Sequence, residues 1–148
     1  MTIYIGSDHR GFQLKKHIKN FLSEKGYEVF DVGNEVYNEN DDYVDFAAKL
    51  AKNISVESDK SKGILICGSG VGVDVVANKF PNVRSALVQS TNQAYDSRND
   101  DDTNILSLSA NYINEKDAEK IVMTWIETPF SNEERHRRRI QKILDLES

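Results

Sequence analysis

A single cysteine, Cys67, stands directly before the glycine-rich segment 68–72, which reads Gly-Ser-Gly-Val-Gly. The apolar run before it, residues 63–67, is typical of a strand that is buried on both faces. Glycines after such a strand let the backbone turn tightly and point several N–H groups at one place, where they would stabilise an anion. A thiolate at Cys67 could act as a nucleophile or as a proton-abstracting base, and Ser69 is close enough in sequence to hydrogen-bond it.

Other interpretations of the glycine segment are weaker or remain open. A dinucleotide fingerprint would need glycine at position 73, where the chain has Val73, and no acidic residue follows the next strand near Gln89. A P-loop would need Gly-Lys-Ser/Thr, which is absent from this segment. A structural strand-to-helix turn, with Cys67 as a small buried hydrophobe, stays open at this point.

A second polar group, residues 7–11, reads Ser-Asp-His-Arg-Gly and follows the first strand-like segment. Asp8, His9 and Arg10 place a carboxylate, an imidazole and a guanidinium side by side, a combination that can bind sugar hydroxyls and phosphate. Asp8 would also serve as a cap for the helix that follows. Capping and ligand binding do not exclude each other.

Arginines gather near the end of the chain, where residues 135–139 read Arg-His-Arg-Arg-Arg. Arg135 and Arg139 are four residues apart, so they share one face of a helix. Two guanidinium groups on one face suit a phosphate dianion, which arginine binds through two parallel hydrogen bonds. The alternative is an exposed basic stripe, or one that pairs with Glu133 and Glu134.

The remaining sequence alternates apolar runs with amphipathic stretches. Strands are expected at 2–7, 28–32, 63–67, 83–89 and 105–108, and helices at 12–25, 43–54, 73–80, 91–98, 116–128 and 133–146. This alternation predicts an α/β protein with a parallel sheet covered by helices on both faces and an extra C-terminal helix. Ligands of such sheets bind beyond the carboxyl ends of the strands. We expect the site at residues 7–11, 33–43 and 67–72, and at the acidic loop 99–102 before the last strand.

Composition limits the partners. With 148 residues, the chain fits one domain, residues 1–148. A net charge of -5 argues against nucleic acid, and no apolar run is long enough to span a membrane. One cysteine excludes an internal disulfide and fits a cytoplasmic protein. The run Asp100–Asp102 lacks the spacing of a calcium loop, so we expect no metal site there.

Five motifs, in this order along the chain, resemble the ribose-5-phosphate isomerase B family, which includes the galactose-6-phosphate isomerase subunits. They are residues 7–11 (SDHRG), 66–72 (ICGSGVG), 77–79 (ANK), 97–98 with 102–104 (SR and DTN), and 135–136 with 139 (RH and R). The resemblance implies a Rossmann-like, doubly wound three-layer sandwich with a five-stranded parallel sheet. It also implies a homodimer, or a tetramer of two dimers, with the active sites at the subunit interface and the C-terminal helix reaching across to the partner.

The resemblance further implies a reaction, the interconversion of ribose 5-phosphate and ribulose 5-phosphate through an enediolate without metal or cofactor. The matching Cys67 would move the proton between C1 and C2, and Ser69 would assist it. Asp8 and Tyr43 would bind the sugar. The enediolate oxygen would be bound by backbone N–H groups, those of Gly68, Gly70, Val71 and Gly72. The phosphate would be bound by His9, Arg135 and Arg139, with the neighbouring His136. The arginines would come from the other subunit.

The chain departs from the family pattern at three places. Members commonly carry His-Asn where this chain has Asp100-Asp101, and that histidine is assigned to opening the furanose ring. We therefore expect Asp100 to act as a catalytic acid and Asp101 to bind substrate. Many members have arginine at the position of Asn111, and Gly-Gly at the position of Glu133-Glu134. A hexose-6-phosphate isomerase, such as galactose-6-phosphate isomerase, and a non-catalytic sugar-phosphate-binding protein are the alternatives.

Overall fold

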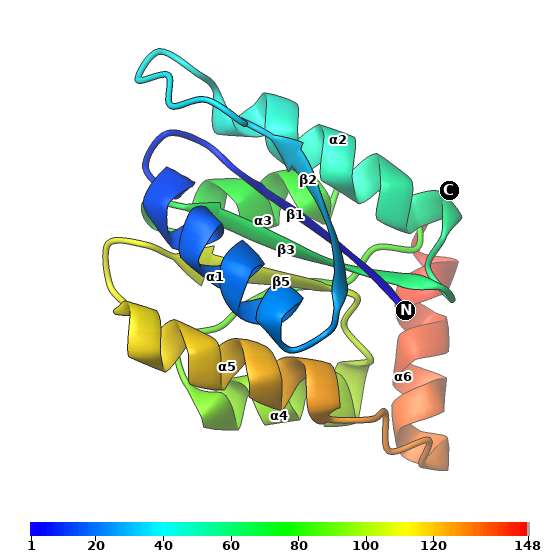
Figure 1. Cartoon of the computed structure of the whole chain (residues 1–148). Helices are drawn as coiled ribbons and strands as arrows, with labels where there is room; N and C mark the ends of the chain where they lie inside the picture. Colours follow the sequence, from blue (N-terminus) through cyan, green and yellow to red (C-terminus); the bar gives the residue numbers. More distant parts are fainter. Residues whose placement is uncertain (148) are drawn as a thin grey trace.

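A sheet of five parallel strands lies between two layers of helices in the computed structural model, which describes residues 1–147 (Figure 1). The strands are β1 (Thr2–Ser7), β2 (Glu28–Gly33), β3 (Ser61–Cys67), β4 (Ser85–Leu87) and β5 (Ile105–Ser109). Their order across the sheet is β2-β1-β3-β5-β4. The predicted doubly wound α/β architecture is therefore confirmed, with β3 at the centre.

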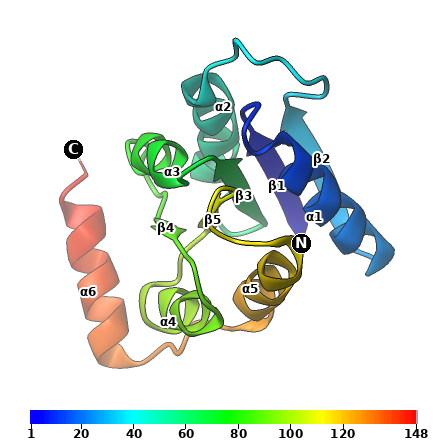
Figure 2. The ribbon, with the colours of Figure 1, turned by 90° about the vertical axis from the view of Figure 1, so that its left-hand side faces the viewer.

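Helices cover both faces of the sheet. They are α1 (Phe12–Glu24), α2 (Tyr43–Val56), α3 (Val71–Ala77), α4 (Thr91–Asp101), α5 (Glu115–Glu127) and α6 (Glu134–Asp145). Helices α1, α4 and α5 lie on one face and α2 and α3 on the other, whereas α6 lies outside these layers, beyond β4 and α4 (Figure 2). Within residues 1–147, no helix combines the length and the apolar character needed to cross a bilayer.

The central strand β3 divides the core into two parts. Ile64 and Ile66 point into the cluster beneath α1 and α5, and Leu65 and Cys67 point into the cluster beneath α2 and α3. This alternation follows from the two-residue period of a strand. The side chain of Cys67 is therefore directed toward the α2–α3 face, at the carboxyl end of the strand.

A switch in winding direction lies beside Cys67. From β1 the chain crosses to its neighbour β2, and from β2 it returns past β1 to β3. The connections on the two sides of this point run over opposite faces of the sheet, which leaves a crevice at the carboxyl ends of β1 and β3. The loops after these two strands carry the residues that the sequence singles out, Asp8 and Cys67.

The differences from the predicted boundaries that bear on the site lie at α3, β4 and α4. Helix α3 begins at Val71 rather than at residue 73, so Val71 and Gly72 are helical residues and not part of the turn. Strand β4 has only three residues, Ser85–Leu87. The expected acidic loop 99–102 is instead the last turn of α4, with Asp102 as its left-handed cap.

Hydrogen bonds from two arginines explain why α4 continues through its acidic end. Aspartates are unfavourable at a helix C-terminus, where the backbone carbonyls already carry partial negative charge. Here Arg98 donates to the Asp102 carboxylate (Nη1–Oδ1, 2.8 Å) and to the carbonyl of Thr103. Arg84 donates to the carbonyls of Asp101 and Asp102, both at 2.9 Å. Two guanidinium groups thus neutralise the end of the helix.

Lys62, near the amino end of β3, carries a half-buried amine. Its Nζ lies 5.8 Å from the centre of the Trp125 ring. Desolvation lowers the pKa of Lys62 to about 8, with a further contribution from the Arg98 charge and an opposing one from Asp102. The folded protein therefore holds this proton less tightly than the unfolded chain, and the charged amine destabilises the fold.

We expect the substitution Lys62→Met to raise the melting temperature at pH 7. Between pH 8 and about 10.5 the unfolded chain binds more protons than the native state, so the free energy of unfolding of the wild type rises with pH across that interval. The difference in melting temperature between Lys62→Met and wild type should therefore be largest below pH 8 and shrink toward pH 10.5. Thermal unfolding at several pH values measures it, with the exposed Lys52→Met as control. A constant gap, or a less stable variant, contradicts the prediction.

Candidate functional site

The turn between β3 and α3 folds back over the sulfur of Cys67. Cys67 is the last residue of β3, is 5% exposed, and accepts a hydrogen bond from the backbone N–H of Gly70 (N–Sγ, 3.2 Å). Gly70 has a φ of +76°, and a Cβ there would lie 2.5 Å from Leu87 and 3.0 Å from the backbone of Leu108. Only glycine fits this conformation and space. The turn thus gives the sulfur a fixed N–H donor.

An open cleft of about 460 Å³ leads to this turn. Its walls come from the loops after β1, β3 and β5 and from the start of α2, and they consist of Asp8, Arg10, Tyr43, Cys67, Gly68, Ser69, Val71, Gly72 and Asn111. The cleft lies at the carboxyl edge of the sheet, where ligands of α/β proteins bind. Cys67 is therefore not sealed in the core, and the interpretation as a purely structural thiol loses its support.

Two glycines let side chains approach the turn closely. A Cβ on Gly68 would lie 2.8 Å from Cδ of Arg10 and 3.0 Å from Nδ2 of Asn111. A Cβ on Gly72 would lie 2.6 Å from the Tyr43 ring. The predicted site at residues 7–11 included Arg10, whereas Asn111 was named only where the chain departs from the family pattern. The sequence did not predict their shared contact with Gly68, because that contact depends on the order of the strands.

The expected anion cradle is only partly free. The N–H of Gly70 donates to Cys67, and the N–H of Val71 donates to Oγ of Ser69 at 3.2 Å. The Ser69 hydroxyl therefore bonds its own turn rather than the thiol. In the part of the chain that the structure describes, the N–H groups of Gly68, Ser69 and Gly72 make no bond to a protein acceptor. These three backbone N–H groups are available to a ligand oxygen.

Asp8 does not cap α1 as expected, because the N-cap is Gly11 and no side chain caps it; its carboxylate stabilises the loop before the helix instead. Its Oδ1 accepts hydrogen bonds from the backbone N–H groups of Arg10 (3.0 Å) and Gly11 (3.1 Å), which fixes the loop before α1. The side chain also lines the cleft, although the residue is only 6% exposed. One carboxylate thus holds the loop and faces the candidate site.

His9 is held by Asp41, a residue that the sequence did not single out. Nδ1 of His9 lies 2.7 Å from Oδ1 of Asp41, and the backbone N–H of His9 donates to the same oxygen at 3.0 Å. Asp41 belongs to the polar segment between β2 and α2, and nothing in its local pattern distinguishes it from its acidic neighbours. It orients the imidazole from a position 32 residues away.

Asp8, His9 and Asp41 are also the residues that could hold a metal ion. One ligand atom from each lies within 4.8 Å of the others. Hydrogen bonds already engage Oδ1 of Asp8 and the imidazole Nδ1. Because these atoms have protein partners, we assign no metal to them.

The remaining predicted site residues lie at the opposite edge of the sheet. Helix α4 carries the chain from the carboxyl end of β4 back to the amino end of β5, so Asp100 and Asp101 lie at the amino edge. The basic start of α6 lies beside them, with His136 Nε2 3.6 Å from Asp100 Oδ1. The expectation that residues 99–102 share one edge with Cys67 is therefore wrong within a single chain.

His136 is the buried member of this second group. It is 4% exposed, and its Nδ1 lies 2.5 Å from Oγ of Ser131. Arg135 and Arg139 are exposed, and Arg135 makes only a long contact with Glu133, at 3.6 Å. Desolvation raises the pKa of the Asp101 carboxyl, as does neighbouring Asp100, while His136, Arg84 and Arg139 oppose the shift. The end of α4 and the start of α6 thus present both guanidinium groups and carboxylates to the surface.

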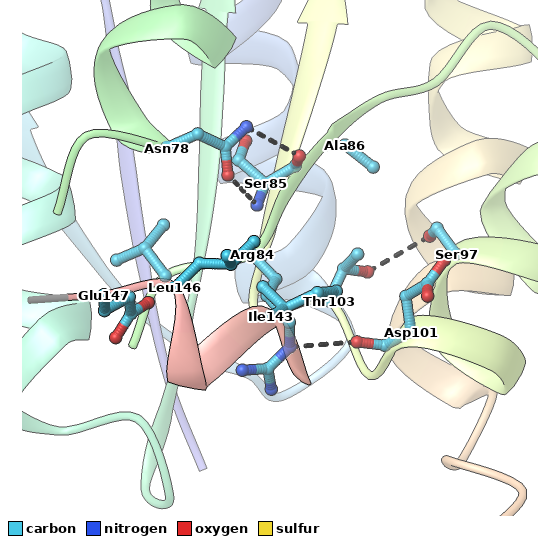
Figure 3. A pocket seen from close by; sticks show the side chains of 11 residues that line it. Asn78, Arg84, Ser85, Ala86, Ser97, Asp101, Thr103, Ile143, Leu146 and Glu147 are labelled. Carbon is cyan, nitrogen blue, oxygen red and sulfur yellow. Dashed lines mark hydrogen bonds between the residues drawn. The ribbon is translucent and has the colours of Figure 1, made fainter. Parts of the chain in front are cut away.

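A larger cavity of about 540 Å³ lies between β4, α4 and α6 (Figure 3). Several polar groups that line this cavity already form hydrogen bonds with other groups of the protein. The Asn78 amide donates to the carbonyl of Ser85 (3.0 Å) and accepts from its N–H (2.8 Å), as a neighbouring strand would at this edge of the sheet. Arg84 and Thr103 bond Asp101 and Ser97. We therefore place the candidate site at Cys67 and not in the larger cavity.

Fold and site together define a class: an α/β protein with a thiol, a carboxylate and free backbone N–H groups in one cleft at the switch point of its sheet. Residues 3–143 match the family described as Ribose/Galactose Isomerase. The chain belongs to this family, as its motifs indicated. The ribose-5-phosphate isomerase B of Escherichia coli is 35% identical over 145 residues, which cover 98% of this chain and 95% of that protein.

Solved structures agree with the family assignment. The crystal structure of ribose-5-phosphate isomerase B from Mycoplasma genitalium with bound ribulose-5-phosphate has a TM-score of 0.96 and 43% identity, covering 99% of this chain and 95% of that one. The corresponding enzyme from Clostridium thermocellum has a TM-score of 0.94 and 41% identity, with coverage of 99% and 97%.

The substitution Gly70→Ala should destabilise the protein and weaken the N–H contact to Cys67. A left-handed alanine costs roughly 1–2 kcal/mol, and overpacking against Leu87 and Leu108 adds about 1–3 kcal/mol. Gly26 is the matched control, because it has a φ of +92° and a Cβ there would meet nothing within 4 Å. Denaturant unfolding should show a larger loss for Gly70→Ala than for Gly26→Ala. Equal losses would contradict the steric argument.

Proposed function

We propose that the chain is an aldose–ketose isomerase that interconverts ribose 5-phosphate and ribulose 5-phosphate. The observation that carries the proposal is the Cys67 sulfur, which has a fixed Gly70 N–H donor in a cleft open to solvent. Its family membership supports the substrate class, since a relative of 43% identity has been solved with bound ribulose-5-phosphate. We place the enzyme in the cytoplasm, where a free thiol stays reduced.

In this proposal the thiolate of Cys67 removes the proton from C2 of the open-chain aldose and returns it to C1, while the proton of the O2 hydroxyl passes to O1. The electrons left on the sugar become an enediolate, whose negative oxygen needs donors that are already in place. The free N–H groups of Gly68, Ser69 and Gly72 supply them. The hydrogen bond from the Gly70 N–H holds the sulfur in position for both proton transfers. Neither transfer needs a cofactor.

The other side chains of the cleft bind the non-reacting part of the sugar. Asp8 and Tyr43 contact its hydroxyls, and Ser69 orients the turn through its bond to Val71. His9, which lies in sequence between the lining residues Asp8 and Arg10 and is held by Asp41, meets the phosphate. Anchoring the remote end in this way turns binding energy into correct placement of the C–H bond.

We further propose that the active enzyme is a homodimer with sites shared between subunits. Arg135, Arg139 and Asp100 lie at the edge of the sheet away from Cys67, so one chain cannot bring them to its own cleft. A second copy of the chain can bring them there, because a two-fold axis can place the amino edge of one sheet beside the carboxyl edge of the other. Val71 and Val75, one helical turn apart, are 50% and 55% exposed beside the cleft, which fits a covered surface.

Within that dimer, Asp100 of one subunit is the acid that opens the sugar ring of the other. His136 lies beside this carboxylate, with its Nε2 3.6 Å from Oδ1 of Asp100. Arg135 and Arg139 complete the phosphate clamp.

The substitution Cys67→Ala should lower kcat by about three orders of magnitude or more, because the general base is lost, while KM changes little. Conversion of ribose 5-phosphate and exchange of its C2 proton with solvent measure the effect. Thermal unfolding checks that the variant folds. Wild type should be assayed in parallel on a hexose 6-phosphate.

Three outcomes would contradict the proposal. Full activity in Cys67→Ala excludes the thiol as base. A higher kcat/KM on the hexose 6-phosphate assigns the enzyme to the longer substrate. Tight binding of ribose 5-phosphate by folded wild type, without proton exchange, indicates a sugar-phosphate sensor rather than an enzyme.

A mixture of two inactive variants tests the shared site. Cys67→Ala and Arg135→Ala homodimers should each be nearly inactive. In a mixed dimer one site carries both lesions and the other carries neither, so co-expression should restore about a quarter of wild-type activity, given random pairing of subunits. No recovery in verified mixed dimers would show that Cys67 and Arg135 act within one chain.

A further inference from the structure

Arg10 stands out as a cation inside the cleft that the mechanism does not yet use. It is the one basic side chain among the residues that line the Cys67 cleft. The backbone N–H of Arg10 is bound by Asp8, and its Cδ lies against Gly68. The backbone and the side chain as far as Cδ are thus held at the turn, while the residue as a whole is exposed. The loop therefore brings the guanidinium to the cleft.

The guanidinium of Arg10 makes no ion pair or side-chain hydrogen bond within residues 1–147. This contrasts with Arg84 and Arg98, whose guanidinium groups are engaged with carbonyls and carboxylates at the end of α4. An arginine offers five N–H donors in a planar fork that matches phosphate. Arg10 therefore keeps its full capacity to bind an anion in the cleft.

Asn111 extends this donor surface. Its Nδ2 lies 3.0 Å from the position of a Cβ on Gly68, the same place that Arg10 Cδ approaches to 2.8 Å. Its backbone N–H donates to the carbonyl of Gly68 at 2.9 Å, which holds the loop after β5 against the loop after β3. An amide and a guanidinium thus flank the residue that follows the catalytic thiol.

We infer that Arg10 binds the substrate phosphate from the same chain that supplies Cys67, with Asn111 as a second donor. This inference rests on the proposed isomerase function and adds a residue to its phosphate site. One cation fixed beside the thiol would set the distance between phosphate and base independently of the partner subunit. It would make the cleft selective for phosphorylated sugars before the arginines of α6 contribute.

The test compares Arg10→Gln with wild type as the full-length protein. Loss of one charge-assisted contact to phosphate should raise KM for ribose 5-phosphate by about 10–100-fold, with kcat little changed. Inhibition by inorganic phosphate should weaken by a similar factor. Inhibition by unphosphorylated ribose should not change. Lys16→Gln, which removes the same charge from an exposed position on α1, is the control and should match wild type.

A second variant tests the placement of the cation. In Arg10→Gln combined with Asn111→Arg, a guanidinium returns to Gly68 from the loop after β5 and should restore part of the affinity for ribose 5-phosphate and for inorganic phosphate. Circular dichroism and thermal unfolding confirm that both variants fold. A merely structural role of Arg10 would not be rescued in this way.

Unchanged KM and unchanged inhibition by phosphate in Arg10→Gln would overturn the inference. A fall in kcat alone would also overturn it, since Arg10 would then act at the reacting carbons. If wild type shows no isomerisation, the proposed function fails, and calorimetric titration of inorganic phosphate into wild type and Arg10→Gln still decides the role of Arg10. Equal affinities, or no binding to either, reject it.

Discussion

The close contact between the Cys67 sulfur and the Gly70 N–H is the constraint around which the site is built. It requires the chain to turn sharply within three residues of a buried central strand, and only a left-handed glycine permits that path. The turn then leaves no space for side chains on its outer surface. The side chains of Arg10, Asn111 and Tyr43 approach the backbone of the turn itself. A guanidinium, an amide and an aromatic ring therefore lie at the mouth of the cleft.

The topology of the sheet separates the proposed machinery into two halves. Parallel strands bring the loops after β1, β3 and β5 to one edge, and helices return the chain to the other edge before each new strand. The thiol and its N–H donors therefore lie at the carboxyl edge, and the acidic end of α4 with the basic start of α6 at the amino edge. An assembly of two chains is the simplest way to unite them, since a two-fold axis uses the same pair of edges twice.

Many charged side chains of this chain bind other groups of the protein, so the residue type alone does not show which of them bind a ligand. Arg84 and Arg98 neutralise the end of α4, and Lys15 binds Asp31 and the carbonyl of Asn34 beneath the loop after β2. Asp8 holds a loop with the same carboxylate that faces the cleft. Against this background, a cation without a partner in the described chain, such as Arg10, is informative because its charge is not yet compensated.

Local sequence determined the elements and the central turn. The apolar run of β3, the glycines after it and the alternation of strands with helices predicted a parallel sheet with Cys67 at a strand end, and five ordered motifs indicated the family. These features depend on near neighbours in the chain. Tertiary structure alone decided which distant residues meet: Asp41 at His9, Arg10 and Asn111 at Gly68, and Asp100 away from Cys67. Such contacts depend on strand order and on the length of α4, where Arg84 and the buried Arg98 outweighed the unfavourable aspartates.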